Sequence, residues 1–133
     1  MYVLDTESRE VIDISLRCFQ DLIVWQESMQ LAKEIYKLVK LLPSEERYAL
    51  SDQMRRAAVS IPSNIAEGQA RNSTKEFIQF LYIAKGSNAE LLTQLLLCAD
   101  FSYVTNEQTA EAILLSKKVN RLLTGLIRSL KNK

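Results

Sequence analysis

Residues 55–68 read Arg-Arg-Ala-Ala-Val-Ser-Ile-Pro-Ser-Asn-Ile-Ala-Glu-Gly, and the rest of the chain is organised around this stretch. Most of its side chains are small, which lets two helices approach each other closely. The apolar residues here and just before fall on one helical face: Leu50, Met54, Ala57, Ile61, Ile65 and Gly68. This period continues in phase across Pro62, although a proline inside a helix costs about 3 kcal/mol. We therefore predict a continuous helix that is kinked at Pro62, with Ser60 or Ser63 bonding the freed carbonyls. The alternative is a true break at Ile61.

A second helical pattern precedes this stretch. It runs from Asp21, the expected N-cap, to Leu41, and Pro43 ends it because the residue before a proline is pushed out of the α region. Residues spaced by three and four form its expected core face: Leu22, Trp25, Met29, Ala32, Tyr36 and Val39.

Two capping boxes mark the beginnings of the last two helices. Ser73 with Glu76 begins a helix that ends near residues 101–103, and Thr105 with Gln108 begins the other. A glycine in mid-helix costs about 1 kcal/mol against alanine, so we attribute Gly86 to a close helix crossing. The expected core faces are Phe77, Phe80, Leu81, Ala84, Leu91, Leu95 and Cys98 in the third helix, and Ala112, Leu115, Val119, Leu122, Leu126 and Leu130, broadened by Leu123 and Ile127, in the fourth.

Four helices with short connections predict an all-α fold, an up-down-up-down antiparallel four-helix bundle over residues 19–133. Residues 1–18 form an N-terminal arm that is either extended or disordered. A strand is one interpretation of residues 11–16, but a sheet is improbable without a second strand to pair with. The leucines at positions 91–92 and 95–97 cannot all point inward, which indicates self-association.

The composition argues against an enzyme. The 133 residues include no histidine, which removes the usual general base and the commonest metal ligand, so we expect no catalytic residue, metal or cofactor. The three glycines are isolated and form no phosphate-binding loop. Two cysteines, Cys18 and Cys98, do not make a disulfide framework, and no signal peptide or membrane span is evident. We expect a reduced, cytoplasmic protein without membrane contact.

Polar residues within the opening stretch are the sharpest candidates for a site. Arg55 and Arg56 either contact phosphate or form ion pairs that hold the bundle register, and adjacent helical residues point about 100° apart, so one arginine can serve each role. The expected ion-pair partners are Asp52, Glu67 and Glu90. We interpret Asn64 and Glu67 as satisfying buried polar groups.

Basic residues close the chain. The net charge is only +1, but no acidic residue accompanies the final run of Lys117, Lys118, Arg121, Arg128, Lys131 and Lys133. In an up-down bundle the end of the fourth helix returns to the end at which the second helix meets the third. Arg71 and Lys75 lie at that turn and could join the run in a nucleic-acid-binding patch. The alternative is a solvated charged face.

Three segments, residues 21–26, 53–68 and 77–87 together with Glu90-Leu91, resemble the four helix bundle protein family, whose founding members are encoded in intervening sequences of bacterial 23S ribosomal RNA genes. The resemblance covers residues 19 to about 130. It implies a ring-shaped homopentamer and a similarity to the accessory proteins of diversity-generating retroelements. Those are basic, barrel-like pentamers that work with a reverse transcriptase and RNA. This chain is closer to neutral.

These observations lead to one reading and one alternative. The first is a non-enzymatic, homo-oligomeric bundle that binds RNA or an RNA-associated protein such as a reverse transcriptase. The alternative is a protein-interaction scaffold with no nucleic-acid role.

Overall fold

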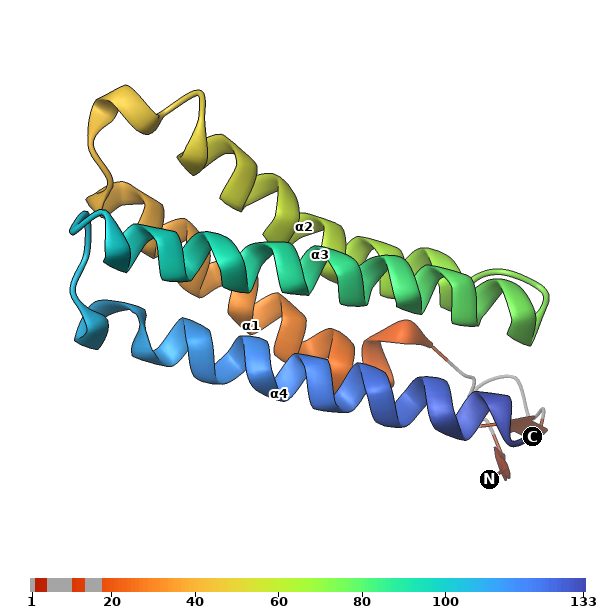
Figure 1. Cartoon of the computed structure of the whole chain (residues 1–133). Coiled ribbons are helices and arrows are strands. Elements are labelled where there is room, and N and C mark those ends of the chain that lie inside the picture. The colour runs from red at the N-terminus through yellow and green to blue at the C-terminus, as the bar shows by residue number, and fades with distance from the viewer. Residues whose placement is uncertain (1, 5–10, 14–17) are drawn as a thin grey trace.

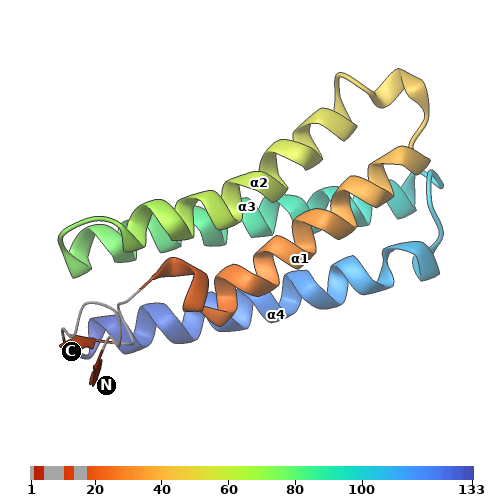
Figure 2. The same cartoon turned by 180° about the vertical axis from the view of Figure 1, so that it is seen from behind.

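The computed structural model describes residues 2–4, 11–13 and 18–133. Within these ranges four α-helices make up the fold: α1 (Ile23–Leu38), α2 (Leu50–Gln69), α3 (Thr74–Asp100) and α4 (Asn106–Lys131). Consecutive helices run in opposite directions, and the two views agree on this arrangement (Figures 1 and 2). Each helix packs on its neighbours in the order α1, α2, α3, α4 and back to α1, so α1 lies diagonally across from α3. The predicted all-α fold with four helices is confirmed.

A short antiparallel strand pair precedes the helices. Strand β1 (Tyr2–Leu4) pairs with β2 (Val11–Asp13), and Val3 lies opposite Ile12. The expectation that a sheet was improbable is therefore wrong. The partner strand that the sequence did not reveal is β1. Its three residues are too few to show the alternation that identifies a strand in sequence. Apart from these strands and Cys18, the predicted N-terminal arm lies outside the described residues.

Side-chain caps define where α3 and α4 begin. The Ser73 hydroxyl accepts a hydrogen bond from the Glu76 backbone N–H at 3.1 Å. The Thr105 hydroxyl accepts one from the Gln108 N–H at 3.1 Å, and the Gln108 side chain accepts one from the Thr105 N–H at 2.9 Å. Both predicted helix starts are confirmed, because each hydroxyl satisfies a backbone donor that has no partner inside the helix. Only Thr105 forms the complete capping box, since the Glu76 carboxylate accepts from the Ser73 hydroxyl and not from its backbone N–H.

The ends of α1 differ from the prediction. Asp21 is not an N-cap: it closes the 3₁₀ helix η1 (Phe19–Asp21), and α1 begins only after Leu22. The rings of Phe19 and Trp25 meet edge to face, with centroids 5.4 Å apart, and this contact accompanies the extra turn. At the other end α1 stops at Leu38 and tightens into η2 (Val39–Leu41), while η3 (Ser44–Glu46) follows Pro43.

Helix α2 continues through Pro62, so the alternative of a break at Ile61 is wrong. Its predicted core face is confirmed, with Met54, Ile61 and Ile65 fully buried. Ser60 does not take the role expected for it. Its hydroxyl lies 2.8 Å from that of Ser87 and accepts from the Asn64 amide, so it links α2 to α3 instead of bonding a freed carbonyl of its own helix.

Most of the core face predicted for the helix before Pro43 is wrong by one position, although Val39 is buried as predicted and Leu22, Trp25 and Ala32 pack at the edge of the core. The buried residues are Val24, Leu31, Ile35 and Leu38, whereas Tyr36 is 45% exposed. Both sets have the same three-and-four spacing, and the buried Ser28 interrupts the true set. In α4, similarly, the core takes Leu123 and Ile127, and Leu122 and Leu126 pack at its edge. The α3 prediction holds, apart from Phe80, which is only half-buried.

Two glycines have opposite surroundings. A Cβ atom on Gly68 would lie 2.5 Å from the Cβ of Phe80 and 3.1 Å from a ring carbon of Phe77, so α2 and α3 can meet here only without a side chain. A Cβ on Gly86 would meet no atom within 4 Å. The close crossing attributed to Gly86 is therefore wrong within the chain, and the crossing lies at Gly68.

These surroundings predict opposite effects of alanine. Gly68→Ala should lower the free energy of unfolding by about 1–2 kcal/mol, because the strain of overpacking exceeds the gain in helix propensity. Gly86→Ala, the matched control, should raise it by about 1 kcal/mol. Urea unfolding followed by circular dichroism measures both. A more stable Gly68→Ala protein would contradict the close approach of α2 and α3.

Candidate functional site

A buried polar contact sets how α3 and α4 lie against each other. The Asn88 side-chain amide donates to the Ser116 carbonyl oxygen at 2.8 Å, and the Ser116 hydroxyl donates to the Asn88 Oδ1 at 2.9 Å. Both residues are almost fully buried. Leaving a buried polar group without a hydrogen-bond partner lowers the folding stability by about 1–3 kcal/mol. The two helices are therefore held in the register that pairs these residues.

One hollow lies toward the end of this helix pair where α4 finishes. It has a volume of about 250 Å³, and Tyr82, Lys85, Arg128 and Lys131 are among the residues that line it. The Lys131 ammonium donates to the Tyr82 hydroxyl at 2.7 Å and lies 5.1 Å from the centre of the Tyr82 ring. Three cations and one aromatic ring therefore gather in a small space.

A second hollow of about 390 Å³ lies farther along the same two helices. Its lining includes Asn88, Leu92, Lys117, Asn120 and Arg121. No carboxylate is among the residues that line either hollow. Hereafter the α3–α4 basic groove means these two hollows and their five cations: Lys85, Lys117, Arg121, Arg128 and Lys131.

The groove contains some predicted residues and lacks others. Lys117, Arg121 and Arg128 line it as members of the basic run, but Lys118 turns the other way and forms an ion pair with Glu27 of α1 at 2.9 Å. Sequence reasoning missed Lys85 and Tyr82 as site residues. They lie three residues apart on α3, but only the register set by Asn88 and Ser116 brings them opposite Arg128 and Lys131.

The turn between α2 and α3, which contains Arg71 and leads directly into Lys75, lies at the same end of the bundle as the end of α4 (Figure 1). The predicted topology is therefore correct. Arg71 is already engaged: it pairs with Glu67 at 2.9 Å and its guanidinium lies 4.9 Å from the centre of the Phe80 ring. Lys75, in the first turn of α3, is exposed. Neither residue lines the α3–α4 basic groove.

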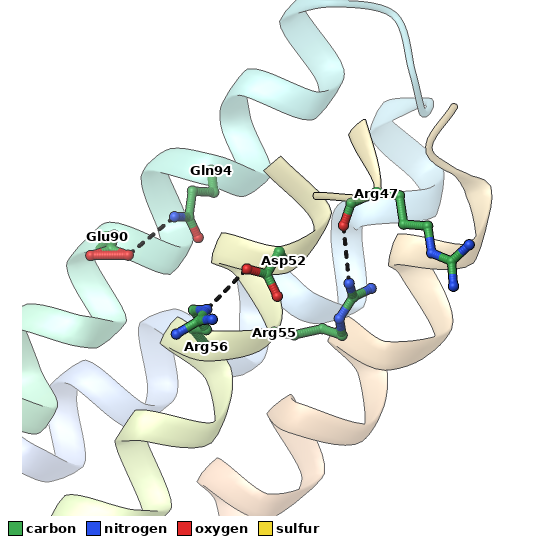
Figure 3. A network of polar contacts seen from close by, with 6 residues as sticks. All are labelled: Arg47, Asp52, Arg55, Arg56, Glu90 and Gln94. Carbon is green, nitrogen blue, oxygen red and sulfur yellow. Dashed lines mark hydrogen bonds and ion pairs between the residues drawn. The ribbon is translucent and has the colours of Figure 1, made fainter. Parts of the chain in front are cut away.

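Arg55 and Arg56 lie on a different side, on α2 (Figure 3). Arg56 pairs with Asp52 at 2.9 Å, and Arg55 donates to the Arg47 carbonyl oxygen at 3.2 Å. Asp52 was one of the three expected partners. The pair joins residues four apart on one helix, however, so it does not hold helices in register, and Arg56 is 78% exposed. Arg55 is half-buried, so the arginines do face different surroundings.

The other two expected partners bind elsewhere. Glu67 is 54% exposed and pairs with Arg71, so its predicted role with a buried polar group is wrong within the chain. Asn64 is half-buried and donates to the Ser60 carbonyl at 2.8 Å. Glu90 accepts a hydrogen bond from the Gln94 amide at 3.2 Å (Figure 3). The Gln94 Oε1 is buried and has no hydrogen-bond partner.

Arg55 and Arg56 also line a shallow hollow, together with Tyr36, Val59, Ser63 and Asn64. It is larger than those of the basic groove, at about 590 Å³, but it includes the carboxylate of Asp52. Its charge is therefore mixed, and the α3–α4 basic groove is the better site for an anion.

The chain is similar to known proteins in both sequence and structure. The sequence model of the 23S rRNA-intervening sequence protein family matches residues 20–125. The chain is also similar to a crystal structure of a protein with unknown function from the S23 ribosomal protein family of Bacteroides thetaiotaomicron. The two are 32% identical, with a TM-score of 0.74, over 79% of this chain and 98% of the other. No curated protein matches the chain.

The described part of the chain, residues 2–4, 11–13 and 18–133, has neither a metal-binding cluster nor a membrane-spanning helix. There, no group of three or more Cys, Asp or Glu side chains is placed to hold a metal ion. None of the described helices is long and apolar enough to cross a membrane. Both cysteines, Cys18 and Cys98, are free thiols.

The two thiols differ in their surroundings. Cys98 is fully buried and lies 3.5 Å from the Met54 sulfur. Burial, with a smaller effect of the Glu46 charge, raises the pKa of the Cys98 thiol to about 11. The reactive species is the thiolate, so Cys98 is unreactive near neutral pH. Cys18 is only half-buried.

Alkylation should therefore separate the two thiols. At pH 8, a pKa of about 11 leaves roughly one Cys98 thiol in a thousand as thiolate, and no path from solvent reaches it. In folded protein, iodoacetamide should modify Cys18 and leave Cys98 unmodified, as read by peptide mass spectrometry. In denaturant both should react. Equal modification of the two cysteines in folded protein would contradict the burial of Cys98.

Proposed function

Because this chain belongs to the 23S rRNA-intervening sequence protein family, we propose that it is a non-enzymatic, homo-oligomeric four-helix bundle that binds RNA or an RNA-associated protein such as a reverse transcriptase. The observation that carries this proposal is the α3–α4 basic groove, where five cations gather without a carboxylate among the lining residues. Phosphate contacts by Lys and Arg supply most of the affinity of proteins for nucleic acid. A cytoplasmic location belongs to the same proposal.

Helix electrostatics alone does not account for these cations. Arg128 and Lys131 lie in the last turn of α4, where positive charge offsets the negative end of the helix dipole. That effect fades beyond the last turn. Lys117 and Arg121 lie in mid-helix and face the same groove, so a further negative partner explains them better.

The exposed apolar side chains of α3 support assembly. Leu91 and Leu95 are fully buried, whereas Ile83, Leu96, Leu97 and Phe101 are between 37% and 55% exposed. At about 100° per residue, Ile83, Leu97 and Phe101 fall on one stripe of the helix, hereafter the outer face of α3, whereas Leu96 lies on the side of Lys85. Monomers rarely leave such a face open, so we propose that a second copy covers it. The family resemblance points to a ring of five copies, and a bend of α2 at Pro62 would shape the surface that each copy presents.

The same outer face favours the alternative, a protein-interaction scaffold without a nucleic-acid role. In that case a different protein would cover the outer face of α3, and the basic groove would be a solvated surface. Salt-dependent RNA binding distinguishes the two functions.

RNA binding tests the proposed function directly. Fluorescence anisotropy should show that the chain binds structured RNA, with log affinity falling linearly against log salt concentration. Replacing Lys117, Arg121, Arg128 and Lys131 by glutamine should weaken binding at low salt and reduce the magnitude of the slope by roughly three, because each lost phosphate contact contributes about 0.7–0.9.

The matched control removes four cations from elsewhere. Lys33, Lys37, Lys40 and Arg47 are exposed and line neither hollow of the groove, so replacing them by glutamine changes the net charge equally. The control protein should keep most of its affinity. If both quadruple variants lose the same affinity, binding reflects net charge alone and the proposed site is wrong.

Assembly is tested by the mass of the protein in solution. Light scattering should give a mass of five times the 15.2 kDa of one chain. Leu97→Glu combined with Ile83→Glu should shift the protein toward the monomer mass, because a charge buried in an apolar contact is strongly unfavourable. Tyr48→Glu, at a residue that is 84% exposed outside this face, is the control. A wild-type protein that is monomeric at high concentration would contradict the proposed assembly.

A further inference from the structure

Tyr82 distinguishes the α3–α4 basic groove from a simple charged surface. A large aromatic residue lies between Lys85 of its own helix and Lys131 of α4, and it remains 46% exposed. It is not part of the buried core. Cations alone are enough to bind a row of phosphates. The exposed ring therefore indicates a second kind of contact with a ligand.

The contacts of Tyr82 orient it for such a role. Lys131 donates to the Tyr82 hydroxyl at 2.7 Å and lies 5.1 Å from the ring centre. Together these distances place the ammonium beyond the hydroxyl, near the edge of the ring and not over its centre. This contact holds the side chain at the groove wall and keeps a cation beside the ring.

The remaining cations extend from Tyr82 as a track. Lys117, Arg121, Arg128 and Lys131 are separated by four, seven and three residues, which keeps them on one face of α4. At 1.5 Å per residue they span roughly 21 Å along the helix. The amides of Asn120 and Asn132 lie among them and offer donors and acceptors that base edges could use.

We infer that the groove binds single-stranded RNA, with a base stacked on Tyr82 and the following phosphates on the α4 cations. This inference rests on the proposed function, since it names the form of RNA that the same groove takes. A base in a duplex is already stacked and cannot reach a side chain, whereas single strands are commonly bound by aromatic stacking beside a basic track. An acidic peptide would use the cations but would gain nothing from the ring.

The test compares two RNAs on the full chain. One is an unstructured single strand of about 10 nucleotides and the other is a duplex of the same length. Tyr82→Ala should weaken single-strand binding roughly 5- to 150-fold, the usual effect of losing one stacked base, and should change duplex binding little. Tyr82→Phe keeps the ring and should stay close to wild type. A fluorescent purine analogue in the single strand should be quenched by wild type and much less by Tyr82→Ala.

Tyr36 provides the matched control. It is 45% exposed, close to the value for Tyr82, but it lies on α1 beside the Arg55 hollow. Tyr36→Ala should bind both RNAs as wild type does, and circular dichroism should show each variant folded.

Separate outcomes address the two proposals. If Tyr82→Ala binds the single strand as wild type does while the quadruple variant of α4 fails, the stacking inference is overturned and the proposed function stands. Loss of binding in Tyr36→Ala instead of Tyr82→Ala would also overturn the inference, because it would move the site to α1 and α2. A wild-type protein that binds neither RNA, or that prefers poly-glutamate to both, would overturn RNA binding by the α3–α4 basic groove together with the inference.

Discussion

The buried contact between Asn88 and Ser116 is the constraint on which the functional surface depends. An apolar helix pair can slide by a turn with little loss, since one leucine replaces another. Two reciprocal hydrogen bonds within an apolar core do not allow this, because a shifted register would bury both groups without partners. The contact therefore decides which residues of α3 face which residues of α4, and it brings Lys85 and Tyr82 opposite Arg128 and Lys131.

The other side of α3 is held by a different kind of contact. Gly68 lets α2 approach until only a hydrogen atom fits between it and Phe80, and Ser60 meets Ser87 farther along the same pair. Small side chains thus bring α2 close, whereas polar side chains align α4. Helix α3 is the element common to both contacts, and this explains why it combines fully buried leucines with Ser87 and Asn88 in mid-helix.

Sequence reasoning predicted what depends on neighbouring residues and failed on what depends on other helices. The caps at Ser73 and Thr105 and the continuity through Pro62 are local properties of backbone hydrogen bonding and helical period, and all were correct. The core face of α1 was wrong because two sets of residues shared one spacing and Ser28 hid the true set. The close crossing was assigned wrongly to Gly86, and Lys85 was not predicted as a site residue. The surroundings of both depend on the register between helices, which the sequence of either helix alone does not contain.

The positions of the apolar and basic residues on α3 and α4 limit how a second copy and a nucleic acid could bind to the chain at the same time. The outer face of α3 carries Ile83, Leu97 and Phe101, and the basic groove begins on the next face of the same helix with Tyr82 and Lys85. A copy that covered both faces would bury several cations without acidic partners, which is strongly unfavourable. A copy that covers only the outer face leaves the groove open at its border. In a closed ring of identical contacts, each groove would then lie beside a subunit boundary, and the cations of successive copies would repeat around the ring.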